Sequence, residues 1–238
     1  QAWLNTYEAD DTARDVDFLF SELPLASAAT VLDVGCAQGR HMREIARRKR
    51  IAMCGIDSSG DLIDFARSSI AGLSADADYF EVSVENVIRC EPLFDCAYSL
   101  GTSFGYHADF DLEAWLESIR GMLAQGGWLL LETVLILECF LGTATSRVHD
   151  NMYGNVRVQR AERVDWEHRL LRTRYTYSKG DLSEKVVREF KIYPLDEFRQ
   201  ASENAGFFVA KVYNRERRPA ISGERSSRYG FLLRSRRA

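Results

Sequence analysis

A run of small residues follows a short apolar segment near the start of the chain, and its spacing suits close contact with a ligand. Residues 30–34 are apolar enough to form a buried strand, and the run Gly-Cys-Ala-Gln-Gly occupies positions 35–39. Glycine lets a ligand approach the backbone, and a helix beginning near Gly39 offers unpaired N–H groups. The pattern predicts a nucleotide-like ligand bound to an α/β fold.

The spacing of the small residues argues against a dinucleotide. A pyrophosphate-binding fingerprint requires G-x-G-x-x-G. Its three glycine positions would here be Gly35, Ala37 and Arg40. The third glycine permits close packing of helix on strand, which the long side chain of Arg40 would prevent.

The same segment resembles the first motif of the class I S-adenosylmethionine-dependent methyltransferases, an acid followed by G-x-G-x-G. The acid is Asp33, and Ala37 stands in place of the middle glycine. In that family the loop wraps the methionine end of S-adenosylmethionine. The resemblance gives this role to Asp33, Gly35, Cys36, Ala37 and Gly39, and it places Arg40 and His41 near the carboxylate of the cofactor.

Asp57 ends a second apolar segment, at residues 51–56. A carboxylate at this place can accept hydrogen bonds from both ribose hydroxyls. The alternative is an acid that merely stabilises the N-terminus of the next helix. The resemblance favours the ribose, with Ser58 and Leu62 flanking the adenine.

The adenine side departs from the family pattern. The family usually has an acid after the third strand, where this chain has Ser83 followed by Val84. Either Ser83 or Glu85 substitutes for it, or the alignment with the family is shifted by one residue. Ser99 and Leu100, at the end of the fourth strand, complete the predicted cofactor site.

A glycine-bearing loop with hydroxyls and aromatic rings follows the fourth strand and predicts the acceptor side. The sequence Thr-Ser-Phe-Gly-Tyr at 102–106 resembles a segment of methyltransferases that modify amines and amino sugars. Ser103, Tyr106, His107 and Tyr153 are the predicted substrate residues. Tyr106 and His107 are the catalytic candidates, because a histidine with a pKa of about 6.5 can accept a proton at neutral pH. The alternative is that His107 is a surface residue.

Two aromatic residues near the N-terminus, Trp3 and Tyr7, could cover the bound cofactor. An aromatic face would favour the positive sulfonium. Packing into the core, or disorder of this segment, explains the two residues equally well.

Alternating strands and helices must position these loops. Apolar segments at 30–34, 51–56, 79–82, 94–100 and 128–134 predict strands, with helices at 39–48, after Ser58 and at 112–123. A helix at 10–23 precedes them, and a helix at 195–205 with strands at 207–213 and 229–233 follows. Such alternation implies a doubly wound, mainly parallel α/β sheet, here of seven strands, and hence the Rossmann-like methyltransferase fold.

The segment between residues 135 and 193 has a different character. Residues 156–166, 170–177 and 185–193 are strand-like and joined by turns, which predicts an inserted antiparallel β meander. We therefore expect an S-adenosylmethionine-binding domain from 1–134 and 194–238. The insertion at 135–193 would form part of the acceptor site.

Composition restricts the remaining possibilities. The five cysteines include no C-x-x-C pair, and the histidines include no H-x-x-x-H pair, so we expect reduced thiols, no bound metal and a cytoplasmic protein. No segment has the pattern of a signal peptide. The most apolar stretch, 128–141, contains Glu132 and Glu138 and is too short for a membrane span.

The charge distribution leaves the partner open. The net charge is −4, yet residues 211–238 carry nine bases against two acids. A solvated loop and strand, or a site for an anion or RNA, would explain this excess. The main hypothesis is in-line methyl transfer from S-adenosylmethionine to a nitrogen or oxygen of a small molecule, by a monomer or homodimer without nucleic acid. The alternatives are a tRNA- or protein-directed methyltransferase and a non-catalytic S-adenosylmethionine-binding module.

Overall fold

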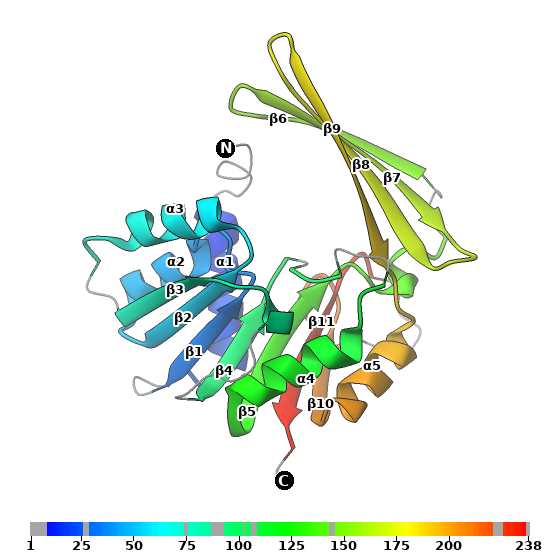
Figure 1. Cartoon of the computed structure of the whole chain (residues 1–238). Coiled ribbons are helices and arrows are strands. Elements are labelled where there is room, and N and C mark those ends of the chain that lie inside the picture. The colour runs from blue at the N-terminus through cyan, green and yellow to red at the C-terminus, as the bar shows by residue number, and fades with distance from the viewer. Residues whose placement is uncertain are drawn as a thin grey trace.

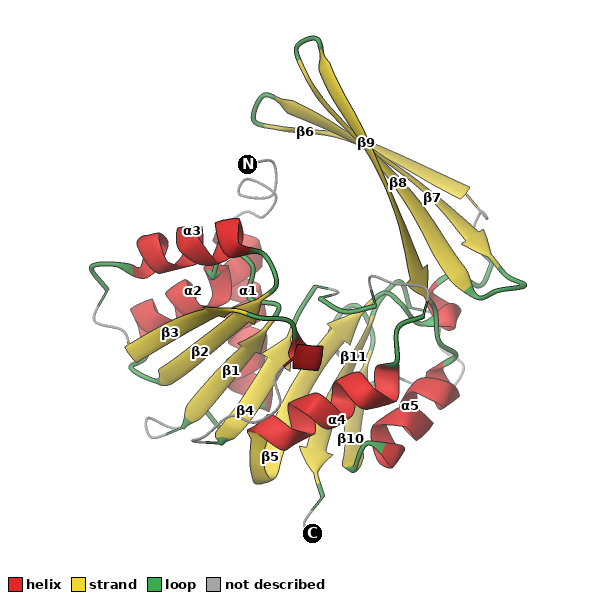
Figure 2. Ribbon diagram, viewed as in Figure 1, coloured by secondary structure: helices red, strands yellow, loops and turns green. Residues whose placement is uncertain are grey.

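The computed structural model describes residues 9–25, 29–73, 76–86, 93–101, 103–105, 109–142, 146–220 and 226–236. They form a seven-stranded sheet with helices on both sides and a separate four-stranded sheet (Figures 1 and 2).

The first part of the chain alternates strands and helices. In order these are α1 (Ala9–Glu22), β1 (Thr30–Val34), α2 (Arg40–Arg48), β2 (Ala52–Asp57), α3 (Gly60–Ile70), β3 (Asp76–Glu81), the 3-10 turn η2 (Val84–Asn86), β4 (Phe94–Ser99), α4 (Leu112–Met122), β5 (Leu123–Thr133) and the turn η3 (Leu137–Cys139). The second part contains β6 (Ser146–Tyr153), β7 (Val156–Asp165), β8 (Leu170–Lys179), β9 (Leu182–Lys191), α5 (Leu195–Asn204), β10 (Phe207–Tyr213) and β11 (Tyr229–Ser235).

The large sheet has the strand order β10-β11-β5-β4-β1-β2-β3. The pairs from β5 to β3 are parallel, whereas β11 is antiparallel to both β5 and β10. The order reverses between β1 and β4, the position at which open α/β sheets bind ligands. The predicted fold class is confirmed.

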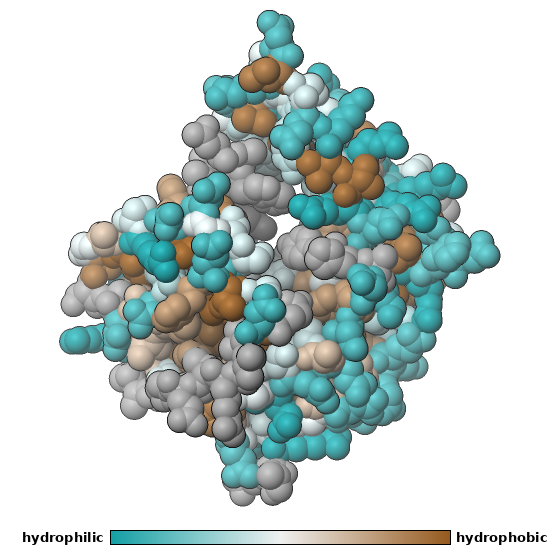
Figure 3. All heavy atoms as spheres, viewed as in Figure 1, coloured by the Kyte–Doolittle hydropathy of each residue, from teal (hydrophilic) through white to brown (hydrophobic). Residues whose placement is uncertain are grey.

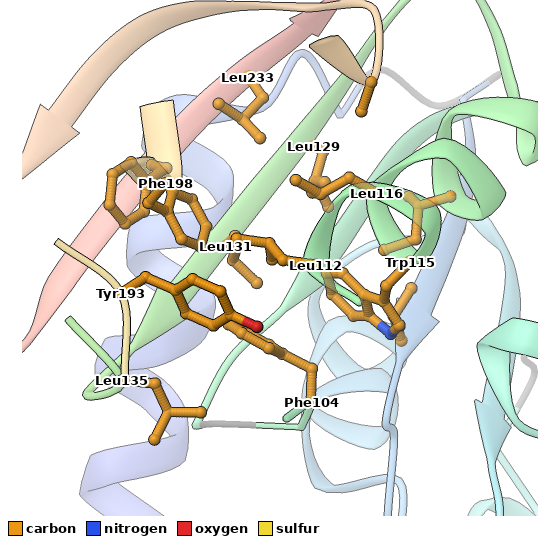
Figure 4. Packing of buried hydrophobic residues seen from close by; sticks show 14 of the residues in the cluster. Phe104, Leu112, Trp115, Leu116, Leu129, Leu131, Leu135, Tyr193, Phe198 and Leu233 are labelled. Atoms are coloured by element: carbon orange, nitrogen blue, oxygen red, sulfur yellow. The ribbon is translucent and has the colours of Figure 1, made fainter. Parts of the chain in front are cut away.

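Two hydrophobic cores cover the two faces of this sheet. Helices α1, α2 and α3 pack on one face, around residues such as Val16, Met42 and Ile63. Helices α4 and α5 pack on the other, where Trp115 and Phe198 lie close to Phe104 (Figure 4). Phe104 belongs to the loop after β4, so this second core anchors the predicted acceptor loop.

Strands β6–β9 form the antiparallel sheet that we call the arm. It projects from the side of the large sheet on which the parallel strands have their carboxyl ends (Figure 1). Its base is apolar, because Val164, Leu171 and Phe190 belong to the same core as α4 and α5. The arm is thereby attached to the body by buried contacts.

Three elements differ from the sequence prediction. The arm has a fourth strand, β6, whose sequence contains the turn-forming pair Asp150-Asn151. Asp150 instead accepts hydrogen bonds from Arg157 and Gln159 across the β6–β7 hairpin. Strand β3 begins earlier than predicted because it is a polar edge strand, and β5 begins at Leu123, with the glycines at 126 and 127 inside it.

Candidate active site

A cavity of about 1110 Å³ lies between the carboxyl ends of the central strands and the arm. Its wall comes from the segments that follow β1, β2, β3 and β4 and from the face of the arm that is turned toward them. The space-filling view shows the hollow that separates the arm from the body (Figure 3). Pockets for one drug-sized ligand occupy roughly 300–1,000 Å³, so this cavity has room for more than one small ligand.

The loop at 35–39 is tied to β2 by its backbone. The amides of Gly35 and Cys36 both donate to the carbonyl of Ile56, over 2.8 and 3.0 Å. Ala37 takes a left-handed conformation, with φ of 47°. A side chain makes this conformation unfavourable by about 1–2 kcal/mol, which explains why the family motif has glycine at this position.

The two glycines of the loop are required by packing inside the protein. A Cβ atom on Gly35 would lie 2.2 Å from Cβ of Ser103, in the loop after β4. One on Gly39 would lie 2.7 Å from the hydroxyl of Tyr79. The glycines therefore let the loop sit against β3 and the acceptor loop, and Gly39 itself does not line the cavity.

Asp57 holds the loops on both sides of it. Its Oδ2 accepts the amide of Ala37 at 3.0 Å, and its Oδ1 accepts the amide of Ser59 at 2.9 Å. A carboxylate oxygen can accept two hydrogen bonds, so each one keeps capacity for a ligand. Asp57 lines the cavity and is suited to bind a pair of hydroxyls.

Asp33 lies beneath the loop. Its side chain is buried and accepts a hydrogen bond from the Tyr98 hydroxyl at 2.9 Å. Burial raises the pKa of Asp33 to about 7, although this hydrogen bond and the charge of Arg40 oppose the rise. Asp33 thus supports the loop from below without lining the cavity.

A network of charged groups connects helix α1 to the cavity. Asp15 pairs with Arg40 at 2.6 Å, with His41 at 3.1 Å and with Arg217. Arg217 also pairs with Glu132, which contacts Arg228. Arg40, His41 and Arg228 line the cavity, so α1 holds part of its wall in place.

The network keeps the carboxyl group of Asp15 ionised. Burial raises the pKa of its carboxyl, but hydrogen bonding to His41 and the charges of His41 and Arg40 outweigh burial and hold the pKa well below its ordinary value. Burial lowers the pKa of His41, against the effect of Asp15. Both shifts favour the folded state at neutral pH over acidic pH.

We expect Asp15→Asn to lower the free energy of unfolding by about 2 kcal/mol at pH 7, because the arginines lose a charged acceptor. A carboxyl with a lowered folded pKa stabilises fully above its unfolded pKa and loses this contribution as the pH falls through the folded value. The difference in the free energy of unfolding between Asp15→Asn and the wild type should therefore persist at pH 5 and shrink below pH 4. Urea unfolding at several pH values measures it.

Asp17→Asn is the matched control, because Asp17 lies on the same helix and forms an exposed pair with Arg48. Exposed pairs contribute roughly 0–1 kcal/mol. Equal losses of unfolding free energy in the two variants would show that the Asp15 network stabilises the fold no more than an exposed ion pair does.

The structure brings most of the predicted cofactor residues together. Those that line the cavity are Gly35, Cys36, Ala37, Arg40, His41, Asp57, Ser58, Leu62, Ser83, Val84 and Leu100. Asp33, Gly39 and Ser99 lie behind the wall; the Ser99 hydroxyl is buried and has no hydrogen-bond partner within the described chain. Trp3 and Tyr7 lie outside the described residues, as does the side chain of Glu85.

The predicted acceptor residues divide similarly. Ser103 lines the cavity, whereas Tyr106 and His107 lie outside the described residues. Tyr153 does not line it. Strand alternation puts Tyr153 on the same arm face as His149, but four residues farther out, which is about 13 Å along a strand.

Sequence reasoning missed the polar residues of the arm that face the cavity. His149, Arg160, Glu162, Tyr175 and Arg188 all line it. His149 Nε2 lies 3.7 Å from Glu162 Oε2. These two residues are therefore candidates for proton transfer in addition to Tyr106 and His107. Polar alternation along the strands was the available signal, but it does not tell which face of a sheet is turned inward.

These residues fit S-adenosylmethionine on three counts. Asp57 can receive the ribose hydroxyls, the left-handed loop brings backbone close to the cavity, and the volume leaves space for an acceptor. Among the described residues, no group of three or more His, Cys, Asp or Glu side chains is placed to hold a metal ion. Within the same part of the chain, no helix has the length and apolar character needed to cross a membrane.

Comparisons with known proteins agree with this geometry. Residues 31–127 match the family model described as a methyltransferase domain. This segment, which contains β1 to β4 and the loops of the candidate site, is therefore similar to methyltransferase domains.

The curated relatives have names that state a particular activity. The tRNA U34 carboxymethyltransferase of Marinobacter nauticus is 34% identical over 109 residues, which is 45% of this chain and 32% of that protein. The chain thus matches about a third of the length of this relative.

Solved structures resemble nearly the whole chain. An S-adenosylmethionine-dependent methyltransferase from Clostridium acetobutylicum has a TM-score of 0.76 at 11% identity, covering 95% of this chain and 92% of its own. CalS10, an amino pentose methyltransferase from Micromonospora echinaspora with bound S-adenosylmethionine, has a TM-score of 0.69 at 20% identity, covering 98% and 94%. At these identities the likeness establishes the fold, arm included.

Proposed function

We propose that this chain transfers a methyl group from S-adenosylmethionine to a nitrogen or oxygen of a small molecule held between the large sheet and the arm. The observation that carries the proposal is the cavity, which is bounded on one side by the cofactor loops and on the other by the arm. The cofactor would supply a methyl group bound to a positively charged sulfur.

The protein would act mainly by positioning. Holding two reactants in line can contribute roughly 7–11 kcal/mol to the rate. Phe104 and Gly105 form part of the cavity wall, and the core fixes Phe104 against Trp115 at a centroid distance of 4.8 Å. This rigid wall would hold the acceptor atom in line and exclude water.

Two groups of side chains are candidates for receiving the proton of the acceptor. Gly105 and Asp109, on either side of Tyr106 and His107, both line the cavity, which supports the proposed role of that loop. The second group is His149 with Glu162.

The pH dependence of turnover distinguishes the two histidines. We expect His107→Ala to remove the limb of the pH–rate profile between pH 6 and 8 while the affinity for S-adenosylmethionine stays unchanged. His149→Ala is the matched variant. A profile that changes only in His149→Ala would assign the proton to the arm, and an unchanged profile in both would show that no histidine is the base.

The names of the curated relatives favour one second candidate, a tRNA acceptor. Incubation with S-adenosylmethionine labelled in the methyl group separates the two. The proposal predicts label in a small amine or alcohol and none in added tRNA. Label in tRNA alone would support the second candidate and contradict the first.

A further inference from the structure

The face of the arm that is turned toward the cavity, called the inner face here, has its charges in two neighbouring rows. Register places Arg147, Glu162, Thr173 and Arg188 in one row across the four strands. His149, Arg160, Tyr175 and Val186 form the next row. Three arginines and a histidine therefore face the cavity with a single carboxylate among them.

That carboxylate is already engaged. Glu162 lies 3.2 Å from Arg160 Nε and 3.7 Å from His149 Nε2. Among the described residues, neither Arg147 nor Arg188 has a carboxylate within ion-pair distance. On the opposite face of the arm, Arg157 and Arg172 have carboxylate partners, whereas Arg163 and Arg174 are exposed to solvent.

Arg160 has a donor that points to no acceptor. Its Nε is buried and has no hydrogen-bond partner in the described chain, because its contact with Glu162 lacks the alignment of a hydrogen bond. A buried N–H without an acceptor costs about 1–3 kcal/mol, which a ligand oxygen would relieve once the guanidinium group turns toward the cavity.

Arg160 and Arg188 belong to the two strands that flank Tyr175 of β8, with Arg160 directly opposite it and Arg188 on the diagonal. Burial raises the pKa of Tyr175, the charge of Glu162 adds to the rise, and the charges of Arg160 and Arg188 together with a hydrogen bond from Arg160 oppose it. The ring of Tyr175 stacks on that of Tyr177, with centroids 6.0 Å apart. Two arginines beside a flat aromatic surface form a binding site for an anion attached to a larger body.

We propose that the methyl acceptor carries a phosphate or carboxylate group, which Arg160 and Arg188 bind beside Tyr175. This inference rests on the proposed function and names the chemical class of its acceptor. The anionic group would fix one end of the molecule on the arm, so that its nitrogen or oxygen reaches the loop after β4. A neutral amine would leave Arg188 without an anionic partner and would bind weakly.

The test measures anion binding without methyl transfer. The full chain, saturated with S-adenosylhomocysteine, is titrated with inorganic phosphate or with succinate while NMR follows the arginine Nε–H signals. We expect saturable shifts in the wild type and, by calorimetry, an affinity for the tighter anion that is roughly 10- to 100-fold weaker in Arg160→Gln/Arg188→Gln. The comparison of phosphate with succinate identifies which anion the site prefers.

Arg163→Gln/Arg174→Gln is the matched control, since these arginines lie on the opposite face of β7 and β8 and are exposed. It should bind both anions like wild type. Equal anion affinity in wild type and Arg160→Gln/Arg188→Gln would overturn the inference, as would tRNA binding that only the opposite-face variant weakens. Failure of the wild type to bind S-adenosylhomocysteine would instead contradict the proposed function.

Discussion

Gly35→Ala should abolish useful affinity for S-adenosylmethionine, with a loss of about 100-fold or more, equivalent to roughly 2.7 kcal/mol. Gly35 has a φ of 75°, and an added Cβ would lie 2.2 Å from the Cβ of Ser103. Either the loop after β1 or the loop after β4 must then move. Both loops line the cavity, so the cofactor would lose its site.

Two further variants separate this clash from the effect of backbone conformation. Gly72 has a φ of 89° and open space around its missing Cβ, so Gly72→Ala has a similar backbone cost and should bind the cofactor normally. Removing the Ser103 side chain in Gly35→Ala/Ser103→Gly should restore part of the affinity, as measured by calorimetry. Without any rescue, the Cβ would instead be meeting the cofactor itself.

Asp57→Ala should weaken S-adenosylmethionine binding by about 10- to 150-fold, because charge-assisted hydrogen bonds contribute roughly 1.5–3 kcal/mol. The carboxylate would hold the ribose and also fixes the amides of Ala37 and Ser59. Asp57→Asn retains one acceptor oxygen, so its affinity for S-adenosylmethionine should lie between those of the wild type and Asp57→Ala. Calorimetry on the folded variants gives the affinities.

Asp61→Ala is the control for charge, since Asp61 lies in the first turn of α3, is exposed and does not line the cavity. It should leave the affinity unchanged. If Asp57→Ala bound the cofactor as tightly as Asp61→Ala, Asp57 would be only a support for the backbone.

The sequence predicted the large sheet well because its signals are local. Apolar runs bounded by Gly and Asp mark β1 and β2, and their order along the chain determines how the sheet is built. The motif residues at 35, 37 and 57 then meet because the carboxyl ends of neighbouring parallel strands share one edge. The left-handed Ala37 shows that the loop keeps its shape even where the middle glycine is missing.

The acceptor side was harder to predict because it depends on contacts between distant segments. Strand β6 has a polar sequence and becomes a strand through pairing with β7. His149 and Glu162 become diagonal neighbours across β6 and β7 only because of that register. Gly39 was assigned to the cofactor from its motif, whereas its neighbours in the fold are Tyr79 and Ala66.

The most direct test of the account is a crystal structure of the chain with S-adenosylhomocysteine. We expect the ligand to lie in the cavity, with its ribose hydroxyls on Asp57, its amino-acid end at the loop 35–41 and its sulfur toward the arm. Binding elsewhere, or a ribose without contact to Asp57, would contradict the account.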